Sequence, residues 1–235
     1  VLVGILSNAE LLLSASGNGL PERFERPLRD IERAGSRAAD LTQQLLSFAR
    51  RKSPSVSRFN VHRVVTDGKE LFQQLIGAEI ALKTYLAPEP VFANADEADV
   101  GRAITNLIIN ARDAMPNGGT VTIRTEFTQL TASEVPVDGE PGSYVRLSVI
   151  DNGLGMAPEV LERIFEPFFT TKPVGRGTGL GLSTVFADVA NCGGFVTADS
   201  QVGNGTTICV HLPAAEGTGK TEEPKCKHTT RPGGG

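Results

Sequence analysis

The sequence predicts an α+β protein in which a helical hairpin precedes a domain of mixed helices and strands. Up to about residue 50, apolar residues recur in steps of three and four, which is the period of an amphipathic helix. From residue 59 onward, helical segments alternate with short runs in which apolar and polar residues take turns. Such runs are typical of half-buried strands.

The first 57 residues contain two amphipathic helices separated by the breaker GNGLP at residues 17–21. A hairpin of this size cannot bury its own apolar face, so we expect it to pair with a second copy into a four-helix bundle. The apolar stripe comprises Leu2, Ile5, Leu6, Ala9, Leu12 and Leu13 in the first helix, and Leu28, Ile31, Gly35, Ala38, Leu41, Leu45 and Phe48 in the second.

Residues 58–213 form the second predicted domain. Helices are predicted over residues 59–76, 96–115, 158–165 and 182–190, and strands over residues 79–86, 90–93, 120–127, 144–151, 195–200 and 206–213. The remaining residues, 214–235, are polar and rich in Pro and Gly, so we expect a disordered tail or linker. A loose P-loop pattern at residues 214–221 is interpreted as a chance match, because no helix can follow it.

Composition excludes several classes of protein. The chain has 235 residues and a net charge of −4, and its densest basic run, residues 50–52, closes a predicted helix, so we expect no nucleic-acid partner. Three distant cysteines form neither a disulfide framework nor a zinc site, which favours a reducing, cytoplasmic location. No apolar run approaches 18 residues, so no membrane segment is predicted. Since the chain begins with Val1, we expect a fragment, and any membrane anchor would lie upstream.

The stretch GRGTGLGLS, residues 175–183, has a glycine at every second position from Gly175 to Gly181 and then enters a predicted helix. One interpretation is a flexible linker. The other is a phosphate cradle, because glycines let backbone N–H groups approach an anion at a helix N-terminus. The spacing matches neither the dinucleotide-binding pattern nor a P-loop, so a phosphate site here would have another architecture.

Four segments occur in a defined order. The predicted helix NLIINARDA carries Asn106 and Asn110 on one face, with Asp113 one turn further on. Asp151 ends a predicted strand and begins DNGLGM, FEPFFTTK ends at Lys172, and GRGTGLGLS follows. Each segment alone has a structural explanation, as a helix surface, a turn or core. Jointly they resemble the N, G1, F and G2 boxes of the histidine kinase ATP-binding domain, in the superfamily that includes gyrase, Hsp90 and MutL.

The resemblance spans residues 58–213 and implies a two-layer α/β sandwich with a mixed sheet and a flexible ATP lid from Phe165 to Thr178. It also implies that Asp151 accepts a hydrogen bond from the adenine amine, and that Asn110 ligates Mg²⁺. The implied catalytic residues are Asn106, Asn110 and Lys172. The implied nucleotide-binding residues are Asn110, Asp113, Asp151, Gly153, Gly155, Met156, Lys172, Arg176, Gly177, Thr178, Gly179, Leu180, Gly181, Leu182 and Thr206.

Asn106 separates kinase from hydrolase chemistry. In the hydrolysing relatives, a glutamate that activates water stands four residues before the magnesium-binding asparagine. An amide cannot accept a proton at neutral pH, so Asn106 favours phosphoryl transfer to a protein nucleophile. Two alternatives stay open: an ATPase or molecular clamp of the gyrase and Hsp90 kind, and a non-catalytic module in which ATP orders an interaction surface.

The hairpin extends the resemblance. The segment LTQQLLSFARR is similar to the second dimerisation helix of sensor histidine kinases, and VLVGILSNAELLL is similar to the first, beginning just after the phosphoacceptor box. This implies a homodimer and a response-regulator receiver domain as partner. None of His62, His211 and His228 fits the box, so we expect the acceptor histidine upstream of Val1, and expect that this chain alone does not phosphorylate itself.

Overall fold

The computed structural model describes residues 56–136, 139–173 and 177–218, together with Leu28, Ile31 and Gly35, which are helical. The chain divides into two units, Pro54–Phe169 with Gly181–Gly235, and Val1–Ser53 with Thr170–Leu180. Each unit is described by itself. Apart from the three helical positions and residues 56–57, the predicted hairpin lies outside the described residues.

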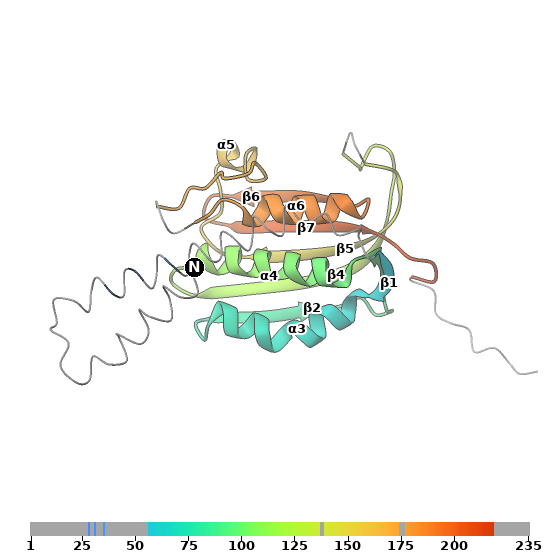
Figure 1. Ribbon diagram of the computed structural model, residues 1–235, viewed down its shortest axis with the longest axis horizontal. Helices are drawn as coiled ribbons and strands as arrows, with labels where there is room; N and C mark the ends of the chain where they lie inside the picture. The colour runs from blue at the N-terminus through green and yellow to red at the C-terminus, as the bar shows by residue number, and fades with distance from the viewer. Residues whose placement is uncertain are drawn as a thin grey trace, which may run out of the picture. The chain divides into compact units, whose positions relative to one another are not determined.

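A five-stranded mixed sheet forms one layer of the main domain (Figure 1). Its strands, in spatial order, are β2 (Ile80–Tyr85), β4 (Gly119–Leu130), β5 (Gly142–Asp151), β7 (Gly205–Pro213) and β6 (Phe195–Gln201). The β2–β4 pair is parallel and the other three pairs are antiparallel. The predicted mixed sheet is therefore confirmed.

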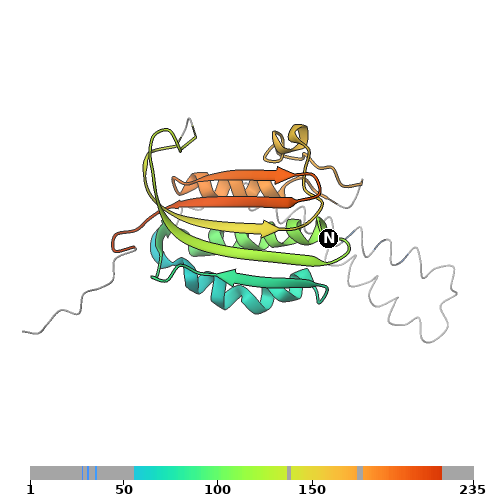
Figure 2. The same cartoon turned by 180° about the vertical axis from the view of Figure 1, so that it is seen from behind.

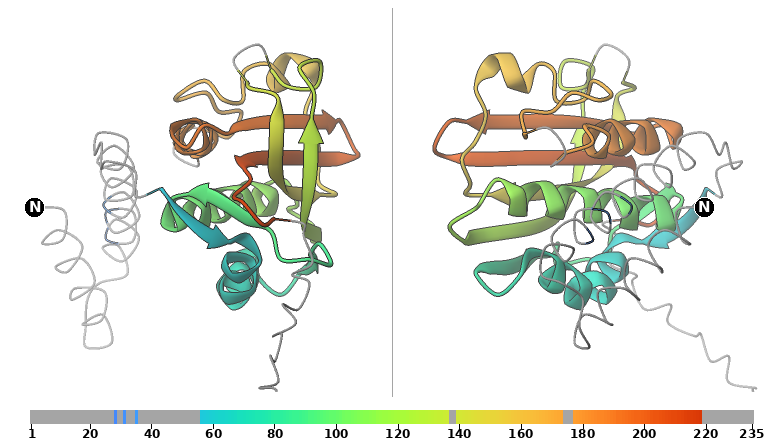
Figure 3. Two further views of the ribbon diagram at one scale, coloured as in Figure 1. Left: turned by 90° about the vertical axis from the view of Figure 1, so that its right-hand side faces the viewer. Right: turned by 60° about the vertical axis from the view of Figure 1, so that its left-hand side comes forward.

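Three helices form the second layer and cover one face of this sheet (Figures 2 and 3). They are α3 (Val61–Ile76), α4 (Glu97–Asp113) and α6 (Gly181–Asn191), while α5 (Pro158–Leu161) is a single short turn. The buried face of α4 comprises Val100, Ala103, Ile104, Leu107, Ile108 and Ala111, spaced as expected for a helix packed on a sheet. The α+β fold class predicted from the sequence is confirmed.

A second sheet was only half predicted. The strands β1 (Ser57–Asn60) and β3 (Phe92–Ala95) pair antiparallel. The sequence predicted a helix from residue 59, but the Asn60 side chain accepts a hydrogen bond from the His62 N–H at 2.9 Å and caps α3. Because an N-cap residue has extended backbone, the helix begins at Val61 and the residues before it join β3.

The ordered domain also extends past the predicted boundary at residue 213. Ala214 bridges to Ala93, and the Ala215 N–H donates to the Phe92 carbonyl at 2.8 Å. The Thr218 hydroxyl, 7% exposed, contacts both the N–H and the carbonyl of Phe92. Residues 214–218 are therefore not part of a disordered tail, while residues 219–235 lie outside the described part of the chain.

None of the helices in the described part of the chain has the length and apolar character needed to span a lipid bilayer.

Candidate functional site

Asp151 is the central polar residue of the candidate site. It ends β5, between Val121 of β4 and Thr206 of β7, and is only 8% exposed. Burial raises the pKa of its carboxyl group, and hydrogen bonds from the backbone N–H groups of Gly153 and Thr206 partly oppose that rise. The Gly153 N–H lies 2.8 Å from Oδ1. The fold thus places a hydrogen-bond acceptor where water has little access.

The turn after Asp151 needs its two glycines. A Cβ on Gly153 would lie 2.5 Å from the Ala114 carbonyl oxygen, and one on Gly155 would overlap the Gln201 carbonyl. Gly155 also has a φ of 66°, a conformation that side chains disfavour. The Leu154 N–H donates to the Ala114 carbonyl at 2.9 Å. These contacts hold the turn between the end of α4 and the end of β6.

Asn152 is a further anchor of this turn, and the sequence reading gave it no role. Its Oδ1 accepts a hydrogen bond from the Thr120 N–H at 2.7 Å, which ties the turn to the start of β4. The sequence predicts a turn here, which resembles the G1 box, but the long-range hydrogen bond between Thr120 and Asn152 depends on the fold and could not be predicted.

The helix α4 presents Asn106 and Asn110 on one face, both partly buried. A Cβ on Gly181, the first residue of α6, would lie 3.5 Å from Nδ2 of Asn110, so this amide lies against the start of α6. The first N–H groups of a helix lack intrahelical partners and carry the positive end of its dipole. An anion bound here would meet those groups and the Asn110 side chain together.

Other predicted residues have different surroundings. The Asp113 carboxylate pairs with the Arg112 guanidinium at 2.7 Å. The side chains of Met156 and Leu182 pack against the hydrophobic core, so they supply apolar surface.

Thr206 of β7 pairs with Asp151 of β5 and is 8% exposed. Its Oγ1 is 2.9 Å from Oγ of Ser200 on β6, and Ser200 is a residue that the sequence reading missed. The signal was present, because Ser200 shares a strand face with Val196 and Ala198. A polar residue in that position needs a partner on the helix-covered side of the sheet.

The segment after α5 contains the predicted lid. The Phe165 and Phe186 rings lie 5.6 Å apart, and the Arg163 guanidinium lies 4.4 Å from the Phe169 ring centre. Phe168 is 63% exposed and has a φ of 67°. The lid up to Phe169 is thus anchored to α6 through Phe165.

Residues 170–180 belong to the other unit and are described by themselves. The Thr170 hydroxyl accepts a hydrogen bond from the Lys172 N–H at 3.2 Å, and the Thr178 hydroxyl accepts one from the Leu180 N–H at 3.3 Å. Gly179 has a φ of 66°. The roles predicted for Lys172, Gly177, Thr178, Gly179 and Leu180 therefore stay predictions, and Arg176 lies outside the described residues.

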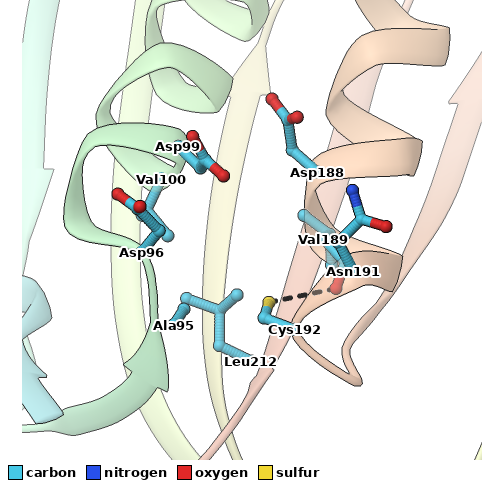
Figure 4. A pocket seen from close by; sticks show the side chains of 9 residues that line it. All are labelled: Ala95, Asp96, Asp99, Val100, Asp188, Val189, Asn191, Cys192 and Leu212. Atoms are coloured by element: carbon cyan, nitrogen blue, oxygen red, sulfur yellow. Dashed lines mark hydrogen bonds between the residues drawn. The ribbon is translucent and has the colours of Figure 1, made fainter. Parts of the chain in front are cut away.

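A small crevice of about 10 Å³ lies at the opposite end of α4, near the end of α6 (Figure 4). Asp96, Asp99 and Asp188 line it, together with the Cys192 thiol, which donates to the Val189 carbonyl. The Arg102 guanidinium bonds Asp99 at 2.6 Å and Asp188 at 3.0 Å. The volume admits about one water molecule, so this cluster serves to tie α4 to α6.

The two histidines in the described residues, His62 and His211, differ in how deeply their side chains are buried. His211 is 5% exposed and stacks on Phe195 at 4.3 Å between ring centres. Burial, and next to it the charge of Arg146, lowers its pKa to about 4. His62 lies in the first turn of α3 and is partly buried, which lowers its pKa. Neither has the exposed imidazole that a phosphoryl acceptor needs, and His228 lies outside the described residues.

No three His, Cys, Asp or Glu side chains in the described ranges are clustered so as to hold a metal ion. A hard cation at this site would take oxygen from an amide such as that of Asn110 and from a bound ligand.

Comparison with known proteins gives one family match. The family described as "Histidine kinase-, DNA gyrase B-, and HSP90-like ATPase" matches residues 95–216. The sensor kinase CckA of Brucella abortus (strain 2308) is 39% identical over 218 residues, which are 91% of this chain and 22% of that protein. The two-component sensor PprA of Pseudomonas aeruginosa is 47% identical over 126 residues, 53% of this chain and 13% of that protein. The chain thus spans about a fifth or less of these relatives.

Solved structures show the same fold. Full-length ShkA in complex with AMPPNP has a TM-score of 0.70 at 24% identity, covering 92% of this chain and 44% of that one. The mycobacterial sensor histidine kinase MprB has a TM-score of 0.53 at 26% identity, covering 68% of this chain and 97% of that one.

Proposed function

The chain belongs to the histidine kinase-, DNA gyrase B- and HSP90-like ATPase family as the ATP-binding domain of a two-component sensor histidine kinase, and we propose that it transfers the γ-phosphoryl group of Mg-ATP to a histidine. The observations that support this proposal are the buried acceptor Asp151 at the end of β5 and the Asn110 amide beside the start of α6.

The residues present fit an adenine nucleotide. The adenine amine is a donor, and a buried carboxylate gives it a strong charge-assisted hydrogen bond while disfavouring the guanine carbonyl. Gly153 and Gly155 keep the turn beside Asp151 packed against the end of α4 and the end of β6, since a Cβ at either would strike the Ala114 or Gln201 carbonyl. The N-terminus of α6 suits the phosphates, with Lys172 and Arg176 as their proposed cationic partners.

Asn110 is the proposed ligand of Mg²⁺, because its side-chain amide lies beside the start of α6 and an amide carries a neutral oxygen that a hard cation accepts. ATP, when bound, supplies the phosphoryl group, and Mg²⁺ neutralises its charge. Asn106 stands one turn before Asn110 and cannot take a proton from water at neutral pH. This chain's own residues therefore bind, orient and neutralise, which is most of what phosphoryl transfer requires.

The phosphoacceptor is proposed to be a histidine outside the described residues, since His62 and His211 are partly or fully buried. From there, we propose relay to an aspartate of a response-regulator receiver domain. Residues 1–57 are the proposed dimerisation hairpin, and residues 58–218 the catalytic domain, in a protein that acts in the cytoplasm.

The test is incubation of the chain with ATP labelled in the γ-phosphate. Release of phosphate should stay far below one turnover per second, the low end of ordinary enzyme rates. Joining a helix with a phosphoacceptor histidine ahead of residue 1 should give protein-bound label that is acid-labile and base-stable, as a phosphoramidate is.

The matched control is the unextended chain with and without His62→Gln. Label on the unextended chain that His62→Gln removes would contradict the proposed acceptor, and brisk phosphate release would favour the clamp ATPase interpretation.

A further inference from the structure

The Ser200 hydroxyl uses its full hydrogen-bonding capacity. Its Oγ lies 2.9 Å from the Met156 nitrogen, 3.0 Å from the Gly205 carbonyl oxygen and 2.9 Å from Oγ1 of Thr206. A hydroxyl has one proton to donate and two lone pairs that accept. Three partners therefore use one donor and two acceptor positions.

The chemistry of two partners assigns the third bond. A carbonyl oxygen can only accept, so Ser200 donates its single proton to Gly205. A backbone N–H can only donate, so Ser200 accepts from Met156. The remaining contact then requires the Thr206 hydroxyl to donate to Ser200, and the Thr206 proton points toward β6.

This direction fixes what Thr206 offers on its other side. With its proton held by Ser200, the Thr206 oxygen has only lone pairs left. Asp151 pairs with Thr206 across β5 and β7, and its carboxylate also only accepts when ionised. Two side chains next to each other, each 8% exposed, are thus both acceptors.

We propose that Ser200 is a positioning residue that sets nucleotide-base specificity, by holding the Thr206 hydroxyl as an acceptor beside Asp151. This rests on the proposed function, in which the base of the nucleotide lies at Asp151. Adenine presents an amine that donates to such acceptors. Guanine presents a carbonyl in the same position, which meets lone pairs from both side chains and finds no donor.

The test compares ATP with GTP by calorimetry on the full 235-residue chain with Mg²⁺. Ser200→Ala frees the Thr206 hydroxyl to turn and donate to the guanine carbonyl, so the ratio of ATP to GTP affinity should fall about fivefold, the contribution of one neutral hydrogen bond. Ser200→Thr keeps the hydroxyl and should keep the wild-type ratio. Thr197→Ala removes an exposed hydroxyl from the same strand and should leave the ratio unchanged.

Ser200→Ala has two effects, because it releases the Thr206 hydroxyl and also leaves the Met156 N–H unpaired. A second experiment distinguishes the change at Thr206 from a general loosening of the turn. In a Thr206→Val background there is no hydroxyl to release, so Ser200→Ala should not change the ratio further. The same change in both backgrounds would overturn the inference, as would an unchanged ratio in Ser200→Ala alone.

Thr206→Val carries the test if Ser200→Ala does not fold. It should weaken ATP about fivefold and leave GTP unweakened, and an equal loss for both nucleotides would overturn the inference. Wild-type chain that binds neither nucleotide would instead remove the proposed function, so the two failures are distinguishable.

Discussion

Replacing Asp151 with Asn should weaken ATP binding while changing how stability depends on pH. A hydrogen bond to a charged group contributes about 1.5–3 kcal/mol, so the Kd for ATP should rise roughly 10- to 160-fold. Asp199→Asn is the matched control, because it removes the same charge from an exposed position on β6. Its Kd should stay within about twofold of wild type.

The effect on stability follows from burial of the Asp151 carboxyl group, which raises its pKa above the ordinary 3.8. Between 3.8 and the raised pKa, the folded state keeps a proton that the unfolded state has released. This group's contribution to stability is therefore lost as pH rises through that interval, with a slope of at most about 1.4 kcal/mol per pH unit.

Asp151→Asn removes this dependence. The unfolding free energy of the variant, measured by urea unfolding relative to wild type at each pH, should rise as pH rises from 3.8 to the raised pKa of Asp151 and should level off above it. A constant offset from altered hydrogen bonds would not change that trend. A relative stability that falls as pH rises would contradict the burial of this carboxyl group, and an ATP affinity equal to that of wild type would contradict its contact with the nucleotide.

Three further predictions concern other parts of the domain. Asn106→Glu supplies a general base and should raise the rate of phosphate release at least tenfold, toward the factor of about 10²–10⁴ that is typical of such groups. Asn106→Gln should leave the rate unchanged, and equal rates in the two variants would contradict the role given to Asn106. Leu107→Ala creates a cavity at a side chain that is only 2% exposed, so it should lower the unfolding free energy by about 2–5 kcal/mol. Leu71→Ala, on the exposed face of α3, should lower it by less than about 0.5 kcal/mol. Similar losses in both variants would contradict the packing of α4 on the sheet. The pKa of His211 is about 4 in the folded state and 6.5 when unperturbed, so the unfolded state takes up a proton first as pH falls. Stability should therefore be lost between pH 6.5 and pH 4, by roughly 3 kcal/mol at pH 4. His211→Phe should remove that loss, and parallel urea-unfolding profiles for the two proteins would contradict the prediction.

Most of the sheet and its helices could be predicted because their signals are local. The strand segments of residues 120–127 and 144–151 alternate in polarity, and α4 shows a helical stripe from Val100 to Ala111. The strand β1 could not be predicted, since its four residues run directly into a helical pattern. Residues 214–218 differ from the sequence prediction for another reason. Their order comes from hydrogen bonds to Phe92, more than 120 residues away in the chain.

The same distinction between local and long-range signals applies to the residues of the candidate site. Asn106, Asn110 and Asp151 could be identified because the residue types, their order and their spacing form a pattern along the chain. The alternation along β6 places Ser200 on the buried face, but its role could not be predicted, because that role depends on the pairing of β6 with β7 and on a third contact to Met156. Sequence patterns indicate which groups carry chemistry, whereas strand pairing decides which groups orient them.

The most direct test of the nucleotide site is a crystal structure of this chain with Mg²⁺ and a non-hydrolysable ATP analogue. We expect the base amine within hydrogen-bonding distance of the Asp151 carboxylate, the phosphates at the N-terminus of α6, and the Asn110 amide oxygen as a ligand of Mg²⁺. A nucleotide bound elsewhere on the domain, or bound here with its base turned away from Asp151 and Thr206, would contradict this expectation.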